Sequence, residues 1–255
     1  MFPNFLVAGS MKCGTSALFR GVTNHPDVFG AKGKELHYFD QNYEQGPQWY
    51  EAHFADAGDV RALGEGTPYL GNETATARMT NDLPDARLLF ILRHPVDRAY
   101  SHYWHNRRRQ RENREFEEAF RTDLESDQEI GRWMNYWRLG TFSKYLEAIA
   151  AEVGRENMHV VLSRDLREQR AETLRGAWAH IGVDPDQGTI EVRERSGPRK
   201  LRRSLKNLIK GRSDDTSYPP LDRSLRNDLT KVYRDDVIRL QEFLQRDLSH
   251  WLEAR

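Results

Sequence analysis

The chain has 255 residues, of which 38% are hydrophobic and 31% charged, and 39 acidic side chains balance its 39 basic ones. This balance gives no overall attraction to nucleic acid. A single cysteine excludes an internal disulfide, and no run of about 18 apolar residues predicts a membrane span. We therefore expect a cytoplasmic protein with one domain over residues 1–255.

Apolar runs bounded by turn residues predict four strands, at residues 4–8, 61–64, 88–92 and 158–162. Helical patterns lie between and after them, at residues 16–24, 48–54, 74–83, 96–109, 116–125, 142–153, 168–181 and 225–252. This alternation predicts an α/β fold in which helices flank a central parallel β-sheet. The last pattern predicts a C-terminal helical segment at residues 222–253, which either packs on the domain or supports a homodimer.

The loop GSMKCGTS, residues 9–16, joins the first predicted strand to the first helix. Its two glycines permit a tight turn, and a helix start attracts anions through unpaired amides and a partial positive charge. An ordinary strand–turn–helix corner is the alternative, but a lysine within the loop favours a P-loop type of nucleotide-binding fold. The candidate ligand residues are Lys12, Cys13, Gly14, Thr15 and Ser16. Since a helix N-terminus lowers a thiol pKa, we expect nucleotide to slow alkylation of Cys13.

A second anion site is predicted where the strand at 88–92 ends. Arg93 follows this strand, Pro95 suits the first helical position, and Ser101 can return toward Arg93. Nucleotide hydrolases and kinases place an Asp at such a strand end to organise Mg²⁺. The arginine instead favours a nucleotide with two anionic ends, bound without a metal.

The segment GKELHYFD, residues 33–40, offers candidate catalytic groups. If the chain is extended here, Glu35 and His37 point to the same side, and either could act as general base for an acceptor hydroxyl. A surface loop of mixed charge is the alternative. Candidate acceptor-binding residues are Lys34, Glu65, Thr67, Pro68 and Tyr136, although core packing is the favoured interpretation of the aromatic residues around Tyr136.

In combination, these motifs resemble the sulfotransferase family, which uses 3'-phosphoadenosine-5'-phosphosulfate (PAPS). The branch containing heparan sulfate sulfotransferases and their bacterial relatives is most similar. The resemblance covers residue 4 to about residue 205. It rests on GSMKCGTSAL at 9–18, KELHYFD at 34–40, GEGTPYL at 64–70, ILRHPVDRAYSHY at 91–103 and SGPRK at 196–200.

The resemblance implies a role for each motif. Lys12 would touch the bridging oxygen of the 5'-phosphosulfate, and Arg93 and Ser101 would bind the 3'-phosphate. Glu35 would be the catalytic base with His37 beside it, and adenosine 3',5'-bisphosphate (PAP) would be released without a metal. A segment that closes over the nucleotide would contain Gly197, Pro198, Arg199 and Lys200.

One departure from the family pattern concerns the acceptor. Gly66 stands where the heparan sulfate enzymes carry a lysine, which weakens the expectation of a heparan-like polyanion. A hydroxyl of a carbohydrate, a small molecule or a natural product stays open as the acceptor. The competing interpretations are an ATP-dependent P-loop kinase and a nucleic-acid-binding module that uses the basic clusters.

Overall fold

The computed structural model describes residues 1–126, 134–190 and 218–253. A parallel sheet of five strands lies at the centre, in the order β2-β3-β1-β4-β5. The strands are β1 Phe5–Gly9, β2 Val28–Gly30, β3 Ala62–Glu65, β4 Arg87–Leu92 and β5 Met158–Leu162. This confirms the predicted α/β fold with a central parallel sheet. The short edge strand β2 was missed, because three residues carry no periodic signal.

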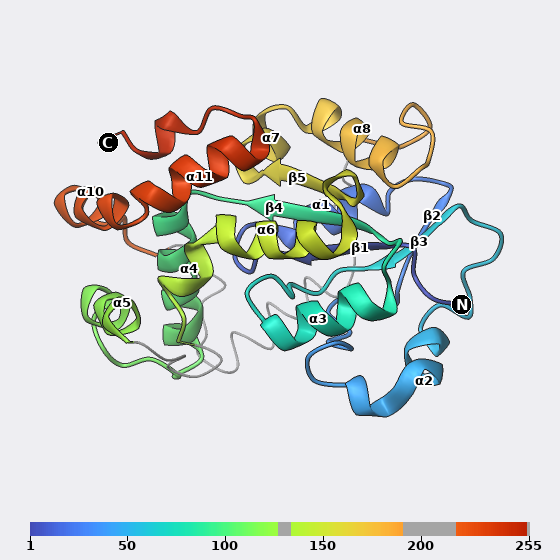
Figure 1. Cartoon of the computed structure of the whole chain (residues 1–255), viewed down its shortest axis with the longest axis horizontal. Helices are drawn as coiled ribbons and strands as arrows, with labels where there is room; N and C mark the ends of the chain where they lie inside the picture. Colours follow the sequence, from blue (N-terminus) through green and yellow to red (C-terminus); the bar gives the residue numbers. More distant parts are fainter. Residues whose placement is uncertain (127–133, 191–217, 254–255) are drawn as a thin grey trace, which may run out of the picture.

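Helices cover both faces of the sheet (Figure 1). They are α1 Thr15–Val22, α2 Gly46–Ala52, α3 Glu73–Asp82, α4 Pro95–Arg108, α5 Phe116–Glu125, α6 Phe142–Val153, α7 Ser163–Glu168, α8 Arg170–His180, α10 Arg223–Val232 and α11 Arg234–Leu244. α6 lies in front of the sheet, packed against α11, while α1 lies behind it and contacts α8. None of the helices in the described ranges is long and apolar enough to cross a membrane.

Two predicted helices are broken in the structure. The pattern at 168–181 is divided at Gln169, whose φ and ψ of −129° and 47° are not helical. The long pattern at 225–252 forms α10, α11 and a short 3-10 turn, with Tyr233 between the two helices. Tyr233 is fully buried and donates a hydrogen bond from its hydroxyl to the Trp137 carbonyl at 3.1 Å. This tertiary contact accompanies a change in chain direction that an amphipathic pattern cannot reveal.

The core positions three loops at one edge of the sheet. Val7 and Leu89 are neighbours across β1 and β4, and both are fully buried. The loop after β3 folds back onto β1, since the backbone amides of Tyr69 and Leu70 donate to the Ala8 carbonyl at 2.8 and 2.9 Å. Because the strands are parallel, the segments that follow β1, β3 and β4 all emerge at this edge.

Candidate active site

The loop between β1 and α1 presents a helix start that has no side-chain cap. Gly14 occupies the N-cap position with φ of 112°, and the first turn of α1 contains no acidic residue. A side chain at Gly9 would be excluded, because a Cβ there would lie 2.6 Å from the Leu70 Cβ. The glycines therefore allow the loop to pass closely over the segment that follows β3 and leave the helix start open to an anion.

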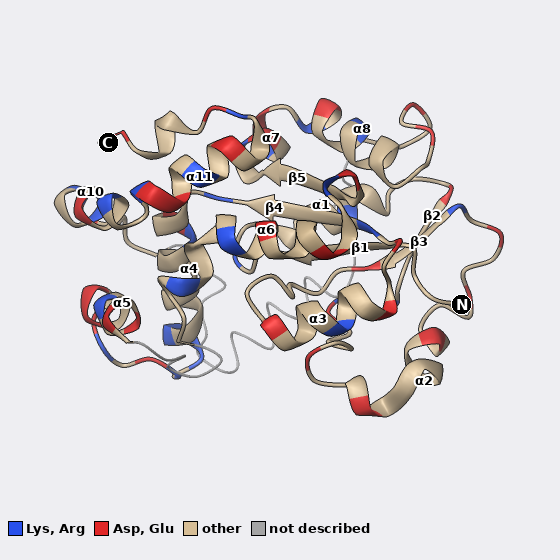
Figure 2. Cartoon of the chain, in the orientation of Figure 1, with Lys and Arg blue, Asp and Glu red and all other residues tan. Residues whose placement is uncertain are grey.

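Lys12 lies within this loop among other cations. Its ammonium lies 3.4 Å from the Nδ1 of His105, on α4. Burial lowers the pKa of Lys12, and the charges of Arg108, Arg109 and Arg93 lower it further. Basic positions are visible along α4 in Figure 2. Several cations so close together repel one another, so this part of the site favours an anionic ligand.

A cavity of about 1190 Å³ opens beside the loop. Its walls come from residues 9–16, here called the phosphate loop, from the 33–40 segment, from the start of α3, and from α4 and α6. The lining residues are Met11, Lys12, Gly14, Thr15, Ser16, Glu35, His37, Asp40, Pro68, Leu70, Gly71, Asn72, Glu73, Thr74, Ser101, His105, Arg109, Asn135, Arg138, Leu139, Lys144 and Tyr145. The candidate catalytic residues Lys12, Glu35 and His37 are thus brought to one cavity.

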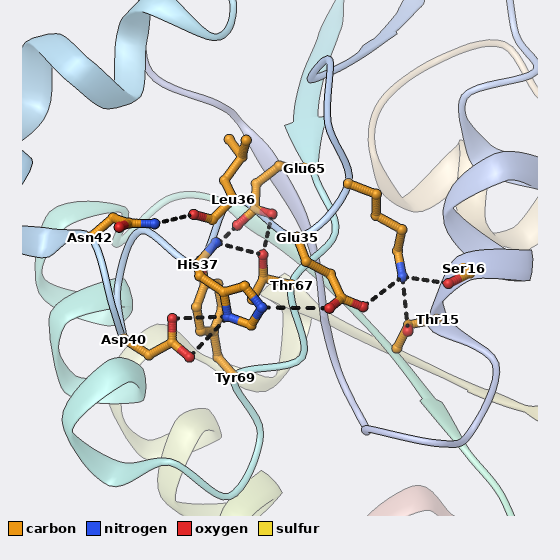
Figure 3. Close-up of polar contacts among 11 residues, drawn as sticks. Thr15, Ser16, Glu35, Leu36, His37, Asp40, Asn42, Glu65, Thr67 and Tyr69 are labelled. Atoms are coloured by element: carbon orange, nitrogen blue, oxygen red, sulfur yellow. Dashed lines mark hydrogen bonds and ion pairs between the residues drawn. The ribbon is translucent and has the colours of Figure 1, made fainter. Parts of the chain in front are cut away.

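His37 lies between two carboxylates, as Figure 3 shows. Its Nδ1 is 3.0 Å from an Asp40 carboxylate oxygen, and its Nε2 is 3.5 Å from Glu35 Oε2. Hydrogen bonding to Asp40, and then to Glu35, raises the pKa of His37 to about 9. The contact with His37 in turn lowers the pKa of Glu35. At neutral pH the pair is therefore an imidazolium beside an ionised carboxylate.

The buried carboxyl group of Glu65 connects to the 33–40 segment through hydrogen bonds. Glu65 accepts hydrogen bonds from the Thr67 hydroxyl at 2.7 Å and from the Tyr69 hydroxyl at 2.9 Å. Thr67 also accepts one from the His37 amide at 3.2 Å. Burial raises the pKa of Glu65 to about 7 although both hydrogen bonds oppose the shift. Glu65 and Thr67 thus connect the end of β3 to the backbone of the catalytic segment (Figure 3).

The profile of the sulfotransferase domain family matches residues 2–149, more than half of the chain. The chain belongs to the sulfotransferase family. The matched range contains the phosphate loop, the 33–40 segment and the Arg93 region, and every residue that lines the cavity falls within it. Membership of this transferase family disfavours the kinase alternative.

Individual sulfotransferases are similar over nearly the whole chain. The mouse bifunctional heparan sulfate N-deacetylase/N-sulfotransferase 4 is 26% identical over 98% of this chain, which spans 31% of that protein. A sulfotransferase crystal structure from Alicyclobacillus acidocaldarius is 27% identical with a TM-score of 0.80, covering 99% of this chain and 100% of that one. Mouse sulfotransferase SULT7A1, solved with PAP, is 14% identical with a TM-score of 0.50, covering 94% and 82%, and shows a similar fold. The chain therefore spans about a third of the length of the mouse heparan sulfate enzyme.

Two candidate ligand residues of this sulfotransferase domain have side chains in the core. Cys13 is 2% exposed, and burial raises the pKa of its thiol to about 11, so the expectation of a lowered thiol pKa was wrong. Tyr136 has no exposed surface and its hydroxyl contacts Glu112 and Asn106, so its side chain cannot line an acceptor pocket. The neighbouring Asn135 lines the cavity instead.

The remaining candidates occupy varied positions. Pro68 and Ser101 line the cavity, whereas the side chains of Glu65 and Thr67 are buried beneath it. Arg93 follows β4, close enough to Lys12 to lower its pKa. Lys34 points to the phosphate loop, where it donates to Ser16 Oγ at 2.7 Å. The predicted nucleotide cover, Gly197, Pro198, Arg199 and Lys200, lies outside the described residues.

Some residues that line the cavity were missed from the sequence. Asp40 is the main partner of His37, and its place three residues later in the same motif was an available signal. His105 reaches the cavity from α4 and Arg109 from the position just after this helix. Arg138 and Lys144 reach it from the segment around the start of α6. The described residues contain no group of three His, Cys, Asp or Glu side chains suited to a metal ion.

Proposed function

We propose that this sulfotransferase domain transfers a sulfuryl group from PAPS to an acceptor hydroxyl and releases PAP. The observation that carries the proposal is that a loop cation, Lys12, and an ionised carboxylate, Glu35, line the same cavity. Transfer of this kind needs a cation where the leaving group departs and a base where the nucleophile enters.

The residues present fit such a donor. An uncapped helix start, Lys12 and the nearby arginines suit the 5'-phosphosulfate. Ser101, which lines the cavity, and Arg93 are the proposed ligands of the 3'-phosphate. When bound, the donor supplies the sulfuryl group and a phosphate leaving group. Lys12 would contact the leaving oxygen, where negative charge grows, and so stabilise the transition state more than the ground state.

The environment of His37 supports Glu35 as the base. With a pKa raised to about 9 by Asp40 and Glu35, His37 already carries a proton at neutral pH and cannot accept another. Glu35 is ionised, because its contact with His37 lowers its pKa. In the proposed mechanism Glu35 takes the proton of the substrate hydroxyl. Asp40 orients His37, and His37 holds the Glu35 carboxylate in place.

The walls of an adjoining groove suggest the acceptor class. A groove of about 470 Å³ between α3 and α6 shares Glu73 and Tyr145 with the main cavity. It also has Glu152 on its wall, and no Lys or Arg is among the described residues that line it. We propose that a neutral or positively charged carbohydrate or small molecule extends into this groove. The named acceptor of the relatives, heparan sulfate, is a polyanion that these glutamates would repel.

A Glu35→Gln variant tests the function. Sulfate transfer from radiolabelled PAPS, measured in an acceptor screen, should fall by about 10²- to 10⁴-fold, the usual contribution of a general base. Calorimetry should show nearly unchanged affinity for PAP. The matched control is Glu44→Gln, since the Glu44 side chain is 93% exposed and outside the cavity.

Two outcomes would contradict the proposal. Loss of PAP affinity in Glu35→Gln would make this residue structural instead of catalytic. Binding of ATP with Mg²⁺ by the wild-type chain, without binding of PAP, would favour the kinase alternative.

A further inference from the structure

Lys34 has an unusual position for a cation. Its ammonium donates to Ser16 Oγ at 2.7 Å and to Thr15 Oγ1 at 3.2 Å, and it lies 3.4 Å from Glu35 Oε1. These three contacts are the dashed lines that join Thr15, Ser16 and Glu35 to one nitrogen in Figure 3. One ammonium therefore bridges the start of α1, which faces the donor, and the proposed base, which faces the acceptor.

The start of a helix is an unfavourable place for a positive charge. The partial charge of the α1 N-terminus is itself positive, and no acidic residue in its first turn offsets it. Burial lowers the pKa of Lys34, against the attraction of Glu35. A cation held beside a positive helix end in this way becomes favourable when an anion binds between them.

Fold stability gives little reason for this arrangement. The ion pair of Lys34 with Glu35 is long, at 3.4 Å, and the two side chains are 22% and 43% exposed. Pairs of this kind contribute little to the free energy of unfolding. By contrast, Lys32, two residues earlier, is 74% exposed and pairs with Asp56, which is also exposed.

Among the described residues, the segment that follows β3, residues 66–72, supplies no cation to this part of the site. Gly66 has no side chain, and a Cβ added there would lie 3.1 Å from the ring of Phe19. A longer residue at position 66 would therefore have to displace this ring. Lys12 approaches from the other side, next to His105 on α4.

We propose that Lys34 is a catalytic residue that binds the oxygens of the transferring sulfuryl group. This inference rests on the proposed function. The acceptor O–H bond breaks and its proton passes to Glu35 while the acceptor oxygen forms a bond to sulfur. The bond from sulfur to the 5'-phosphate oxygen breaks, and its electron pair leaves with that oxygen, next to Lys12. Lys34 keeps its proton, neutralises the sulfuryl oxygens and reduces their repulsion of the Glu35 carboxylate.

The test compares two ligands that differ in the sulfuryl group. Equilibrium dialysis with radiolabelled PAPS and calorimetry with PAP are applied to Lys34→Ala, Lys34→Arg and the control Lys32→Ala. Lys34→Ala should weaken PAPS binding by about 10- to 100-fold, the range for losing one charge-assisted hydrogen bond, and PAP binding by less than about threefold. Lys34→Arg should recover part of the PAPS affinity, and Lys32→Ala should bind both ligands normally.

Each result decides the question. If Lys34→Ala weakens PAP and PAPS binding equally, Lys34 contacts the 5'-phosphate. If its PAPS affinity is unchanged, Lys34 does not contact the sulfuryl group. Either result overturns the inference and leaves the proposed function intact. An equal loss in Lys32→Ala would show a nonspecific charge effect and overturn it as well. Failure of the wild-type chain to bind PAPS would overturn the proposed function itself.

Discussion

Lys12, Glu35 and His37 share a left-handed backbone conformation, with φ angles of 68°, 67° and 52°. For residues with a side chain such conformations cost about 1–3 kcal/mol each, and they persist only where the surroundings hold them. Around the 33–40 segment the Thr67 hydroxyl and the Asn42 side chain supply this support through the backbone of His37 and Leu36. Two other residues, Gln110 and Gln245, share this conformation outside the proposed site, so three of the five such residues in the described chain belong to it.

At the scale of single residues, Lys12→Ala should lower kcat by about 10²-fold or more, as expected when a group that stabilises a developing oxyanion is lost. Steady-state sulfate transfer measures this effect. Arg20→Ala, an exposed cation on α1, is the control and should keep normal kcat. A near-normal kcat in Lys12→Ala would exclude contact with the leaving oxygen.

Protonation of His37 should make stability depend on pH. Its pKa is raised from 6.5 to about 9 in the folded chain, so folding favours the protonated form. The stability that it contributes is complete below pH 6.5 and is lost as the pH rises through about 9. Urea unfolding of the wild type and His37→Gln should therefore show a difference in free energy that shrinks over this range.

The variant Asp40→Asn provides a control for this pH effect. Because Asp40 is the first cause of the raised His37 pKa, this variant should remove most of the same pH dependence. If the difference in free energy of unfolding between wild type and His37→Gln stays constant with pH, these contacts do not raise the pKa of His37.

At the scale of elements, α6 is capped by a residue from α11. Asp236 accepts hydrogen bonds from the backbone amides of Phe142 and Ser143, at 2.9 and 3.0 Å, and from the Ser143 hydroxyl at 2.6 Å. Thr141, at the N-cap position of α6, makes no capping hydrogen bond with its side chain. The first turn of α6, a helix that borders the cavity, thus depends on a residue more than 90 positions later in the chain.

Asp236→Ala should lower the free energy of unfolding by about 1–3 kcal/mol, since it leaves buried amides without partners. Chemical denaturation measures the change. Asp235→Ala is a matched control, because Asp235 also lies in the first turn of α11 but is exposed. Equal losses in the two variants would attribute the effect to the α11 dipole instead of the cap.

At the scale of the whole molecule, the loop that contains Lys12 and the groove between α3 and α6 are bordered by side chains of different charge. Lys12 and the arginines at the end of α4 lie on the proposed donor side, whereas Glu73 and Glu152 border the groove between α3 and α6. Figure 2 shows basic positions on α4, whereas α3 and α6 carry both acidic and basic positions. This separation favours an anionic donor together with an acceptor of low negative charge.

Acceptor oligosaccharides of equal length test this separation. Chitosan and N-acetylated chitosan fragments should give higher kcat/KM than an N-sulfated heparosan fragment. A Glu73→Lys, Glu152→Lys double variant should shift the preference toward the polyanion by roughly 30-fold, since two surface charge contacts of about 1 kcal/mol each sum to about 2 kcal/mol. Preference of the wild type for the polyanion, unchanged in the double variant, would contradict the proposed acceptor class.

Local signals in the sequence determined the outline of the site. Uninterrupted apolar runs predicted four strands, because strands buried in a parallel sheet consist of such runs. Gly9, Gly14 and Lys12 indicated the loop at residues 9–16 that we propose to bind an anion, because its turn and charge are local properties. Pro95 likewise marked the start of α4, where it occupies the first position. Each of these features depends on residues close together in the chain.

Only the tertiary structure decided which side chains reach the cavity and which are buried. Cys13 and Tyr136 are buried because the sheet and helices pack over them, and Lys34 meets the phosphate loop because β2 and β3 bring its segment beside α1. Tyr233 separates α10 from α11 in contact with Trp137, almost 100 residues earlier. Burial and long-range contacts depend on how distant segments pack, which short motifs and periodicity do not encode.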